Sequence, residues 1–156
     1  MDSYYRKKAL YAKQLYDKNL PFVKVYAAVK IGENYLVLKK QKEGKVSYHL
    51  AGGGVEKNES LVKAVKRELL EELNAEVKII RKLGVYDKLT VPYELDGERF
   101  FVKYEIHVFL TEFVKSKNKK FGLKGEFDSS IEIAQIDEKT LLENVAEFCD
   151  FNIALN

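Results

Sequence analysis

The sequence contains very little cysteine and histidine. Among its 156 residues it has one cysteine, Cys149, and two histidines, His49 and His107. A single thiol excludes an internal disulfide framework and any zinc site built from several cysteines. Because the two histidines lie far apart along the chain, a metal site built from histidines is not expected either.

The sequence also lacks a long apolar run. No stretch approaches the roughly 20 consecutive apolar residues that a membrane-spanning helix needs, and the N-terminus lacks the apolar segment of a secretory signal. We therefore expect a cytoplasmic protein without a membrane partner. A strong excess of one charge is missing as well, since 27 Lys and Arg residues stand against 24 Asp and Glu residues, a net charge of +3. This balance leaves nucleic acid possible as a partner without favouring it.

The composition is that of a folded protein. Hydrophobic residues make up 46% of the chain and charged residues 33%, which is typical of a soluble globular protein with a core. The length is close to the roughly 150 residues of one ordinary domain. No internal repeat is visible, and no segment is rich enough in Pro, Gly or Ser to be a linker. We predict a helical extension over residues 1–20, followed by one domain over residues 21–156.

Helix and strand patterns alternate irregularly along the chain. Apolar residues at helical spacing predict helices at 3–18, 59–73 and 138–148. Runs rich in β-branched and aromatic residues predict strands at 22–31, 35–38, 77–83, 86–93, 99–113 and 131–136. A hairpin turn is expected at Asp96-Gly97, and charged loops are expected at 41–45 and 114–125. Because the elements interleave without regular βαβ spacing, we predict an α+β or α/β fold with helices packed on the faces of a mixed sheet.

The clearest helix in the sequence is the one at 59–73. Asn58 is expected to cap it, and Glu59 suits the positive end of the helix dipole. One apolar stripe must face the core, and it consists of Val62, Val65, Leu69 and Leu73. Beside this stripe, three carboxylates fall together within about 100° of arc. These are Glu68, Glu71 and Glu72.

Three carboxylates so close together repel one another. This repulsion can be offset in two ways. In the first, the glutamates lie in solvent beside local cations, which are Lys63, Lys66 and Arg67. In the second, they bind a divalent cation, because Mg²⁺ and Mn²⁺ prefer oxygen ligands and commonly join carboxylates to substrate phosphates. Charge and spacing alone do not decide between the two.

The residues around the glutamates form a wider pattern. Gly53 is followed after five residues by Glu59, and after seven more by the segment Arg67-Glu68-Leu69-Leu70-Glu71-Glu72. This spacing resembles the signature of the Nudix (MutT-like) hydrolases, Gly-x5-Glu-x7-Arg-Glu-apolar-x-Glu-Glu-x-Gly-apolar. The order of elements from 22 to 148 also resembles that family, whose fold is an α/β/α sandwich. The N-terminal helix lies outside the resemblance.

The chain departs from the family pattern at three positions. Ala51 stands where the family's lead-in to the glycines has proline, and Asn74 and Ala75 stand at the final glycine and apolar positions. A helix that ends at the glycine position needs a left-handed residue, and asparagine is the next best choice after glycine. None of these changes affects a carboxylate, so the implied chemistry is retained.

The resemblance implies an enzyme that hydrolyses a phosphoanhydride bond in a nucleoside diphosphate linked to another group. Its cofactor would be Mg²⁺ or Mn²⁺, and its substrate a small nucleotide derivative. The resemblance further implies that Glu68, Glu71 and Glu72 hold the metal together with the backbone carbonyl of Gly52. Glu71 or Glu72 could instead deprotonate the attacking water.

The resemblance also implies supporting roles within the motif. Arg67 is expected to orient the glutamates through charge-assisted hydrogen bonds. Glu59 is expected to brace the glycine segment against the helix. Without a Cβ, Gly53 lets the backbone come close to metal and phosphate.

Outside the motif, the candidate residues each have a structural alternative. Some relatives carry an extra acid shortly before the last strand, and the candidates here are Glu126, Asp128 and Glu132. Their alternative is ordinary surface charge. Tyr48, and Tyr26 or Tyr86, could stack on a base, with core packing as the alternative. Lys120, in the lysine-rich segment, could reach phosphates, with a solvated loop as the alternative.

Two other functions and the oligomeric state stay open at this point. The lysine-rich segment and the pI of about 8.7 allow an enzyme that removes phosphates from an RNA 5′ end. A non-catalytic domain that senses a nucleotide is the other alternative, because fold does not determine function. The N-terminal helix could pack on its own domain or on a second subunit.

Overall fold

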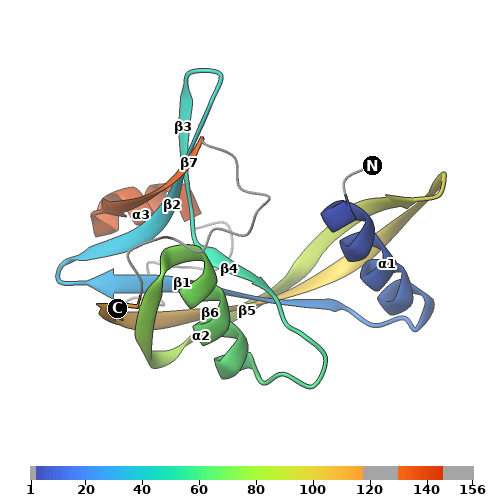
Figure 1. The fold of residues 1–156 in the computed structure, drawn as a ribbon, viewed down its shortest axis with the longest axis horizontal. Coiled ribbons are helices and arrows are strands. Elements are labelled where there is room, and N and C mark those ends of the chain that lie inside the picture. The colour runs from blue at the N-terminus through green and yellow to red at the C-terminus, as the bar shows by residue number, and fades with distance from the viewer. Residues whose placement is uncertain (1–2, 118–129, 146–156) are drawn as a thin grey trace.

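A seven-stranded mixed sheet with helices on both faces forms the body of the protein (Figure 1). The computed structural model describes residues 3–117 and 130–145. In these ranges the helices are α1 (Ser3–Asp17), α2 (Leu61–Leu73) and α3 (Glu138–Val145). The strands are β1 (Phe22–Ile31), β2 (Asn34–Lys42), β3 (Lys45–His49), β4 (Ala51–Gly54), β5 (Ala75–Leu95), β6 (Glu98–Ser116) and β7 (Ile131–Ile136). The predicted fold class, including the N-terminal helix, is confirmed.

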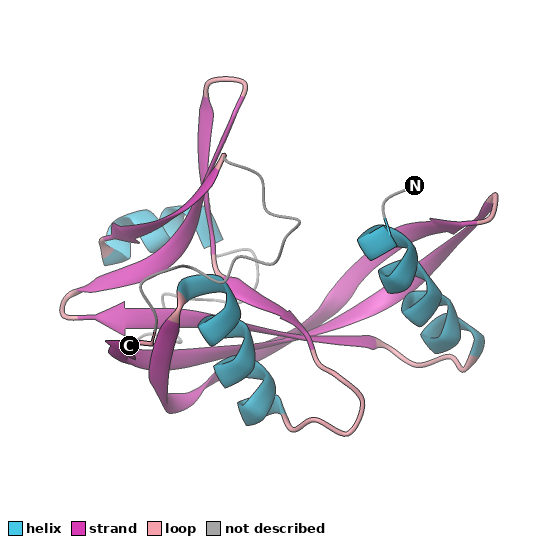
Figure 2. Ribbon diagram, viewed as in Figure 1, coloured by secondary structure: helices cyan, strands magenta, loops and turns pink. Residues whose placement is uncertain are grey.

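Strand β1 lies at the centre of the sheet (Figure 2). Along one edge it pairs in parallel with β6, from Phe22 opposite Tyr104 to Lys30 opposite Glu112. Along its other edge it pairs antiparallel, first with β4 and then with β2. Strand β2 pairs in turn with β3 and β7. The short strand β4 is therefore anchored against the middle of the sheet.

Two hydrophobic cores lie on the two faces of the sheet. The core under α2 contains Ala27 and Val65, and the core on the other face contains Ala28 together with Ala9 of α1 and Leu141 of α3. Successive residues of a strand point to opposite faces, which explains why neighbouring residues of β1 belong to different cores. Helices on both faces make the fold an α/β/α sandwich.

The hairpin of β5 and β6 extends beyond the rest of the sheet and carries α1 near its far end (Figure 1). Its turn is Asp96-Gly97, where φ is 50° and 82°, so the predicted hairpin turn is confirmed. The prediction of separate strands at 77–83 and 86–93 is wrong, because β5 is continuous. Several shifts of register interrupt its pairing with β6, and such bulges break the alternation of apolar residues from which strands are predicted.

Helix α1 packs on this hairpin through small residues. Ala9 and Ala12 are fully buried, so the helix backbone approaches the sheet closely. An ion pair at the surface, between Arg6 and Asp96 at 2.7 Å, joins α1 to the hairpin turn. Exposed ion pairs contribute little to stability because solvent screens them, so apolar packing accounts for most of the attachment of α1.

The ends of α2 are defined by two polar residues. Ser60 is the N-cap, and its hydroxyl accepts a hydrogen bond from the N–H of Lys63 at 3.2 Å. The prediction that Asn58 caps the helix is wrong, because Asn58 lies in a left-handed turn before the cap, with φ 63°. Asn74 ends the helix with φ 52°, and its N–H donates to the carbonyl of Leu70 at 3.1 Å. The predicted left-handed asparagine is thus confirmed.

The buried face of α2 differs from the predicted stripe at one position. Val65, Leu69 and Leu73 are buried as predicted. Val62, however, is 42% exposed, and Ala64 is buried in its place. Since α2 begins two residues later than predicted, Val62 lies in the first turn at the edge of the contact with the sheet.

Two further boundaries differ from the predictions. The charged loop predicted at 41–45 is a two-residue turn at Glu43-Gly44 between β2 and β3. Strand β6 continues to Ser116, into the predicted lysine-rich loop.

No helix in the described part of the chain is long and apolar enough to cross a membrane. The predictions for Lys120, Glu126 and Asp128, and for residues 146–148 of the last helix, lie outside the described residues.

Candidate functional site

Strand β4 brings a glycine backbone against a carboxylate of α2. A Cβ at Gly53 would lie 2.5 Å from Oε1 of Glu68, and a Cβ at Gly52 would lie 2.0 Å from the carbonyl oxygen of Val25. At Gly52 the obstacle is backbone, so only glycine fits there. At Gly53 the obstacle is the Glu68 carboxylate, which a side chain at this position would displace. The backbone of β4 and the end of α2 therefore meet without intervening side chains, as a metal and phosphate site requires.

Arg67 connects the glutamates to the glycine segment. Its Nε and Nη2 atoms donate to the two carboxylate oxygens of Glu59 at 2.7 and 2.9 Å, and its Nη1 donates to Glu68 at 2.9 Å. Nη2 also donates to the carbonyl of Gly54 at 2.9 Å. Glu59 in addition accepts from the N–H of Glu56 at 3.0 Å. The bonds between Arg67 and Glu59 lower the pKa of the Glu59 carboxyl and raise the pKa of Arg67.

The three motif glutamates occupy different environments. Glu68 and Glu72 are only 1% and 6% exposed. Glu72 accepts a hydrogen bond from the backbone N–H of Gly52 at 3.0 Å. The side chain of Glu71 is 36% exposed and contacts Arg67 Nη1 at 3.5 Å. The fold therefore buries two of the predicted metal ligands and leaves the third closer to solvent.

Negative charge exceeds positive charge around Arg67. Its guanidinium lies within 4 Å of four carboxylates, those of Glu56, Glu59, Glu68 and Glu71. Two of the four, Glu59 and Glu68, have side chains only 13% and 2% exposed. Because buried charges are costly unless they are compensated, this excess favours a bound cation. Carboxylate and backbone carbonyl oxygens are the ligands that Mg²⁺ and Mn²⁺ prefer, so the residues present fit such an ion. Within the described ranges, no three acidic, His or Cys side chains are already arranged around a metal position.

A cavity of about 510 Å³ opens beside Glu68 and Glu72. The glycine segment of β4 forms part of its wall. Helix α1 and strand β1 also line it, with Tyr4, Lys7, Lys8, Tyr11, Lys24 and Tyr26. A cavity of this size accommodates a small ligand such as a nucleotide.

Lys24 is a buried cation in this cavity. It is 8% exposed, and its Nζ lies 5.0 to 5.9 Å from the ring centres of Phe22, Tyr26 and Tyr104. These ring faces attract the ammonium group. Burial, and secondarily the nearby Lys8, lower the pKa of Lys24 to about 7. Burial also raises the pKa of Tyr26.

The candidates outside the motif are mostly not at this cavity. Tyr48 and Tyr86 pack against the core on the sheet and do not line it, whereas Tyr26 does. Glu132 lies on β7 and forms an ion pair with Lys39 at 3.4 Å. The structure therefore supports core packing for Tyr48 and Tyr86, and ordinary surface charge for Glu132.

The lysines of the cavity were not predicted from the sequence. The signal for Lys24 was a charged residue inside the apolar run of β1, which indicates a special environment for its side chain. Lys7 and Lys8 carried no comparable signal, because only the packing of α1 on the hairpin brings them to the motif.

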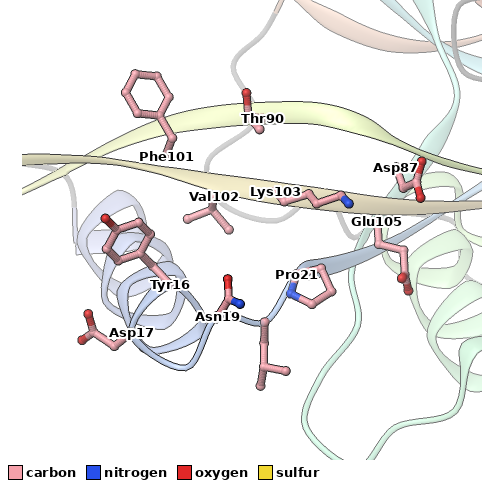
Figure 3. A pocket seen from close by; sticks show the side chains of 11 residues that line it. Tyr16, Asp17, Asn19, Pro21, Asp87, Thr90, Phe101, Val102, Lys103 and Glu105 are labelled. Atoms are coloured by element: carbon pink, nitrogen blue, oxygen red, sulfur yellow. The ribbon is translucent and has the colours of Figure 1, made fainter.

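A larger cavity, of about 740 Å³, lies where the segment between α1 and β1 meets the β5–β6 hairpin (Figure 3). Asp17, Asp87, Lys103 and Glu105 line it together with Tyr16 and Phe101. No motif residue contributes to its wall. The smaller cavity, which contains the buried carboxylates, is therefore the candidate site.

Solved structures with a similar fold are hydrolases. A Nudix hydrolase from Nitrosomonas europaea has a TM-score of 0.57 and 19% identity, over 86% of this chain and 84% of that one. A structure described as ADP compounds hydrolase has a TM-score of 0.54 and 14% identity, over 86% and 66%. An ADP-ribose pyrophosphatase from Streptococcus suis has a TM-score of 0.51 and 13% identity, over 75% and 74%. At these identities the likeness shows the fold alone.

Family membership rests on the sequence. No curated protein matches this chain. The NUDIX domain family matches residues 21–148, a range that contains the whole glycine and glutamate motif and begins after α1. The chain therefore belongs to the Nudix hydrolases, a family of pyrophosphohydrolases.

Proposed function

We propose that this protein hydrolyses a phosphoanhydride bond in a nucleoside diphosphate linked to another group, using Mg²⁺ or Mn²⁺. The observation that carries the proposal is the burial of Glu68 and Glu72 against the glycine backbone of β4, in a cavity of nucleotide size. Solvated surface glutamates would not be buried in this way.

The protein's own groups would divide the work as follows. Of Glu68, Glu71 and Glu72, those that do not act as the general base would hold the cation together with the carbonyl of Gly52. When bound, it would neutralise phosphate charge and polarise the phosphoryl oxygen. Arg67 keeps Glu68 in place and ties it to the glycine segment. This fixed arrangement lowers the cost of reorganising charged groups during the reaction.

Glu72 is the better of the two candidates for the general base. It lines the cavity, whereas Glu71 does not. The hydrogen bond from the Gly52 N–H orients the Glu72 carboxylate. A base must lie within hydrogen-bond reach of the water that it deprotonates, and a residue in the cavity wall meets this condition.

The test is hydrolysis of a substrate panel with and without Mg²⁺, containing nucleoside triphosphates, ADP-ribose, dinucleoside polyphosphates and nucleotide sugars. We expect metal-dependent release of a nucleotide from at least one compound. Glu72→Gln should lower kcat by about 100-fold or more, because loss of a general base typically costs 10²–10⁴-fold. Glu33→Gln, at the exposed β1–β2 turn, is the matched control and should stay within about twofold of wild type. Undiminished activity of Glu72→Gln would refute the assignment of the site.

The two alternative functions receive less support. Most of the lysine-rich segment that motivated the RNA 5′ end lies outside the described residues, and its described lysines, Lys115 and Lys117, pair with Glu76, so it adds no structural argument. A non-catalytic nucleotide sensor has no need of two buried glutamates beside a glycine backbone. Nucleotide binding without hydrolysis under any metal would nevertheless favour the sensor.

A further inference from the structure

A second cavity, here called the side cavity, adjoins the candidate site. It has a volume of about 410 Å³ and lies between α1, the start of β1 and the segment that joins β4 to α2. Four residues line both cavities, and they are Tyr11, Phe22, Gly54 and Glu56. The two cavities therefore share part of their wall, and a ligand bound in the larger one lies next to the side cavity.

The side cavity has an apolar, aromatic surface. Tyr11 and Phe22 meet edge to face, with their ring centres 5.2 Å apart, and Val55 contributes to the same surface. Phe22 is only 4% exposed, and Tyr11 packs against the same core, so the fold holds both rings in place. The polar side chains that line the cavity are all exposed, and they are Gln14, Glu56 and Lys57. Sites for small molecules typically combine such an apolar surface with a few polar groups.

Gly54 lies where the two cavities meet. A Cβ at this position would lie 3.0 Å from Cε1 of Phe22, so a glycine here leaves the Phe22 ring undisturbed. The carbonyl of Gly54 accepts a hydrogen bond from Arg67 at 2.9 Å, and Arg67 also bonds to Glu68. The same arginine therefore fixes the glutamates and the edge of the side cavity relative to one another.

The surface of the side cavity suits one part of a nucleotide better than the others. Phosphates and sugar hydroxyls lose their hydrogen bonds to water against apolar rings, which is unfavourable. A base has apolar faces, and stacking on an aromatic side chain tolerates any base. The amide of Gln14 can both donate and accept a hydrogen bond at the edge of a base.

We propose that the side cavity binds the base of the substrate nucleotide, which stacks on Tyr11 of α1 and contacts Gln14 with its edge. This inference rests on the proposed function, which puts the diphosphate beside Glu68 and Glu72. Helix α1 precedes residues 21–148, the range that matches the family. The proposal therefore assigns base recognition to a helix outside the family domain.

The test compares ligands with and without a base. The α,β-methylene diphosphates of adenosine, guanosine, cytidine and uridine carry a base, whereas methylenediphosphonate has the same bridged diphosphate and no nucleoside. In calorimetry with Mg²⁺, Tyr11→Leu should bind the best of the four nucleotides at least about 5-fold more weakly than wild type, the lower end of the loss expected for base stacking. Tyr11→Phe, which keeps the ring, should bind it within about twofold of wild type. Methylenediphosphonate should bind equally to all three proteins.

Tyr16→Leu is the matched control. It also removes a ring from α1, one that packs on Phe100 with 5.4 Å between ring centres and lines neither cavity. Its affinity for both kinds of ligand should stay within about twofold of wild type. Gln14 is exposed, so Gln14→Ala tests the proposal even if Tyr11→Leu folds poorly. It should weaken nucleotide binding at least about twofold, the size of one hydrogen bond, and leave methylenediphosphonate binding unchanged.

The same data separate this inference from the proposed function. If wild type hydrolyses compounds of the panel but Tyr11→Leu weakens both kinds of ligand equally, the proposed function stands and the base site fails. If wild type hydrolyses nothing under any metal but Tyr11→Leu selectively weakens the nucleotide, the proposed function fails and the base site stands.

Three further results would overturn the base site. The first is equal binding of the nucleotides by wild type and a folded Tyr11→Leu. The second is weaker binding of ADP-ribose by Tyr11→Leu with unchanged binding of α,β-methylene ADP, which would assign the side cavity to the linked group. The third is a change in the sedimentation of Tyr11→Leu with unchanged nucleotide binding, which would assign the side cavity to a contact between two copies of the chain.

Discussion

At the scale of single residues, Arg67 holds the candidate site together. It forms paired bonds to the Glu59 carboxylate and also bonds Glu68 and a backbone carbonyl, and the planar fork of a guanidinium provides the donors for both. A lysine at this position would lose the paired bonds to Glu59. This geometry explains why an otherwise lysine-rich chain, with only four arginines among its 27 cations, has an arginine at this position.

The buried charge of Lys24 lowers the stability of the native protein. Its pKa in the native protein is about 7, against a usual value of 10.5. Above pH 7 the native state loses a proton that the unfolded state retains up to pH 10.5, so the stability of wild type should rise with pH across this window. Below pH 7 the native state bears the full cost of a buried charge.

We therefore predict that Lys24→Met is more stable than wild type at pH 6, by up to about 5 kcal/mol, because the pKa of Lys24 is lowered from 10.5 to about 7 and each pH unit corresponds to about 1.4 kcal/mol. The gain should shrink between pH 7 and 10.5. Urea unfolding of both proteins from pH 6 to 10 measures it, with Lys18→Met as the exposed control. A gain that is absent, or that does not change with pH, would contradict the burial of this ammonium group.

Some residues of the candidate site could be predicted from the sequence and others could not, for a physical reason. The glutamates and Arg67 lie on one helix, where their spacing determines which of them share a side. The contribution of Lys7 and Lys8 depends on packing between segments far apart in the sequence, and periodicity within one helix carries no information about that. Lys24 had a local signal, but alternation alone does not distinguish an exposed lysine from one in a cavity.

At the scale of elements, α2 shows how local chemistry determines where a helix ends. Three of the four residues of its stripe, and its end at Asn74, were predictable because both are local properties. Its start was missed by two residues, because Asn58 and Ser60 are both good caps and the sequence does not show which one adopts the extended conformation. The continuous strand β5 was missed because bulges disturb its alternation.

The end of α2 gives a prediction about backbone conformation. Asn74 has φ 52°, where a Cβ costs alanine about 1 kcal/mol more than glycine or asparagine. We expect Asn74→Ala to be less stable than Asn74→Gly by about 1 kcal/mol. Urea unfolding of the two variants under identical conditions is the measurement. If alanine is as stable as glycine, the left-handed cap does not determine the end of this helix.

At the scale of the whole molecule, α1 and the matched family domain share one core. Ala9 and Ala12 belong to the same cluster as residues of β6 and α3, so the helix predicted as an extension is structurally part of the fold in the described residues. The candidate site lies where α1, the centre of the sheet and α2 meet. This arrangement places an acidic wall and a basic wall around one cavity.

The central claim is that the buried glutamates bind a divalent cation, and Mn²⁺ binding tests it most directly. Electron paramagnetic resonance should show free Mn²⁺ disappearing as wild-type protein or Glu33→Gln is added. With Glu68→Gln, at least about 10-fold weaker binding is expected, because a ligand bond to the cation is lost. Binding to Glu68→Gln as tight as to wild type, or no binding to wild type in the presence of a nucleotide, would contradict the account.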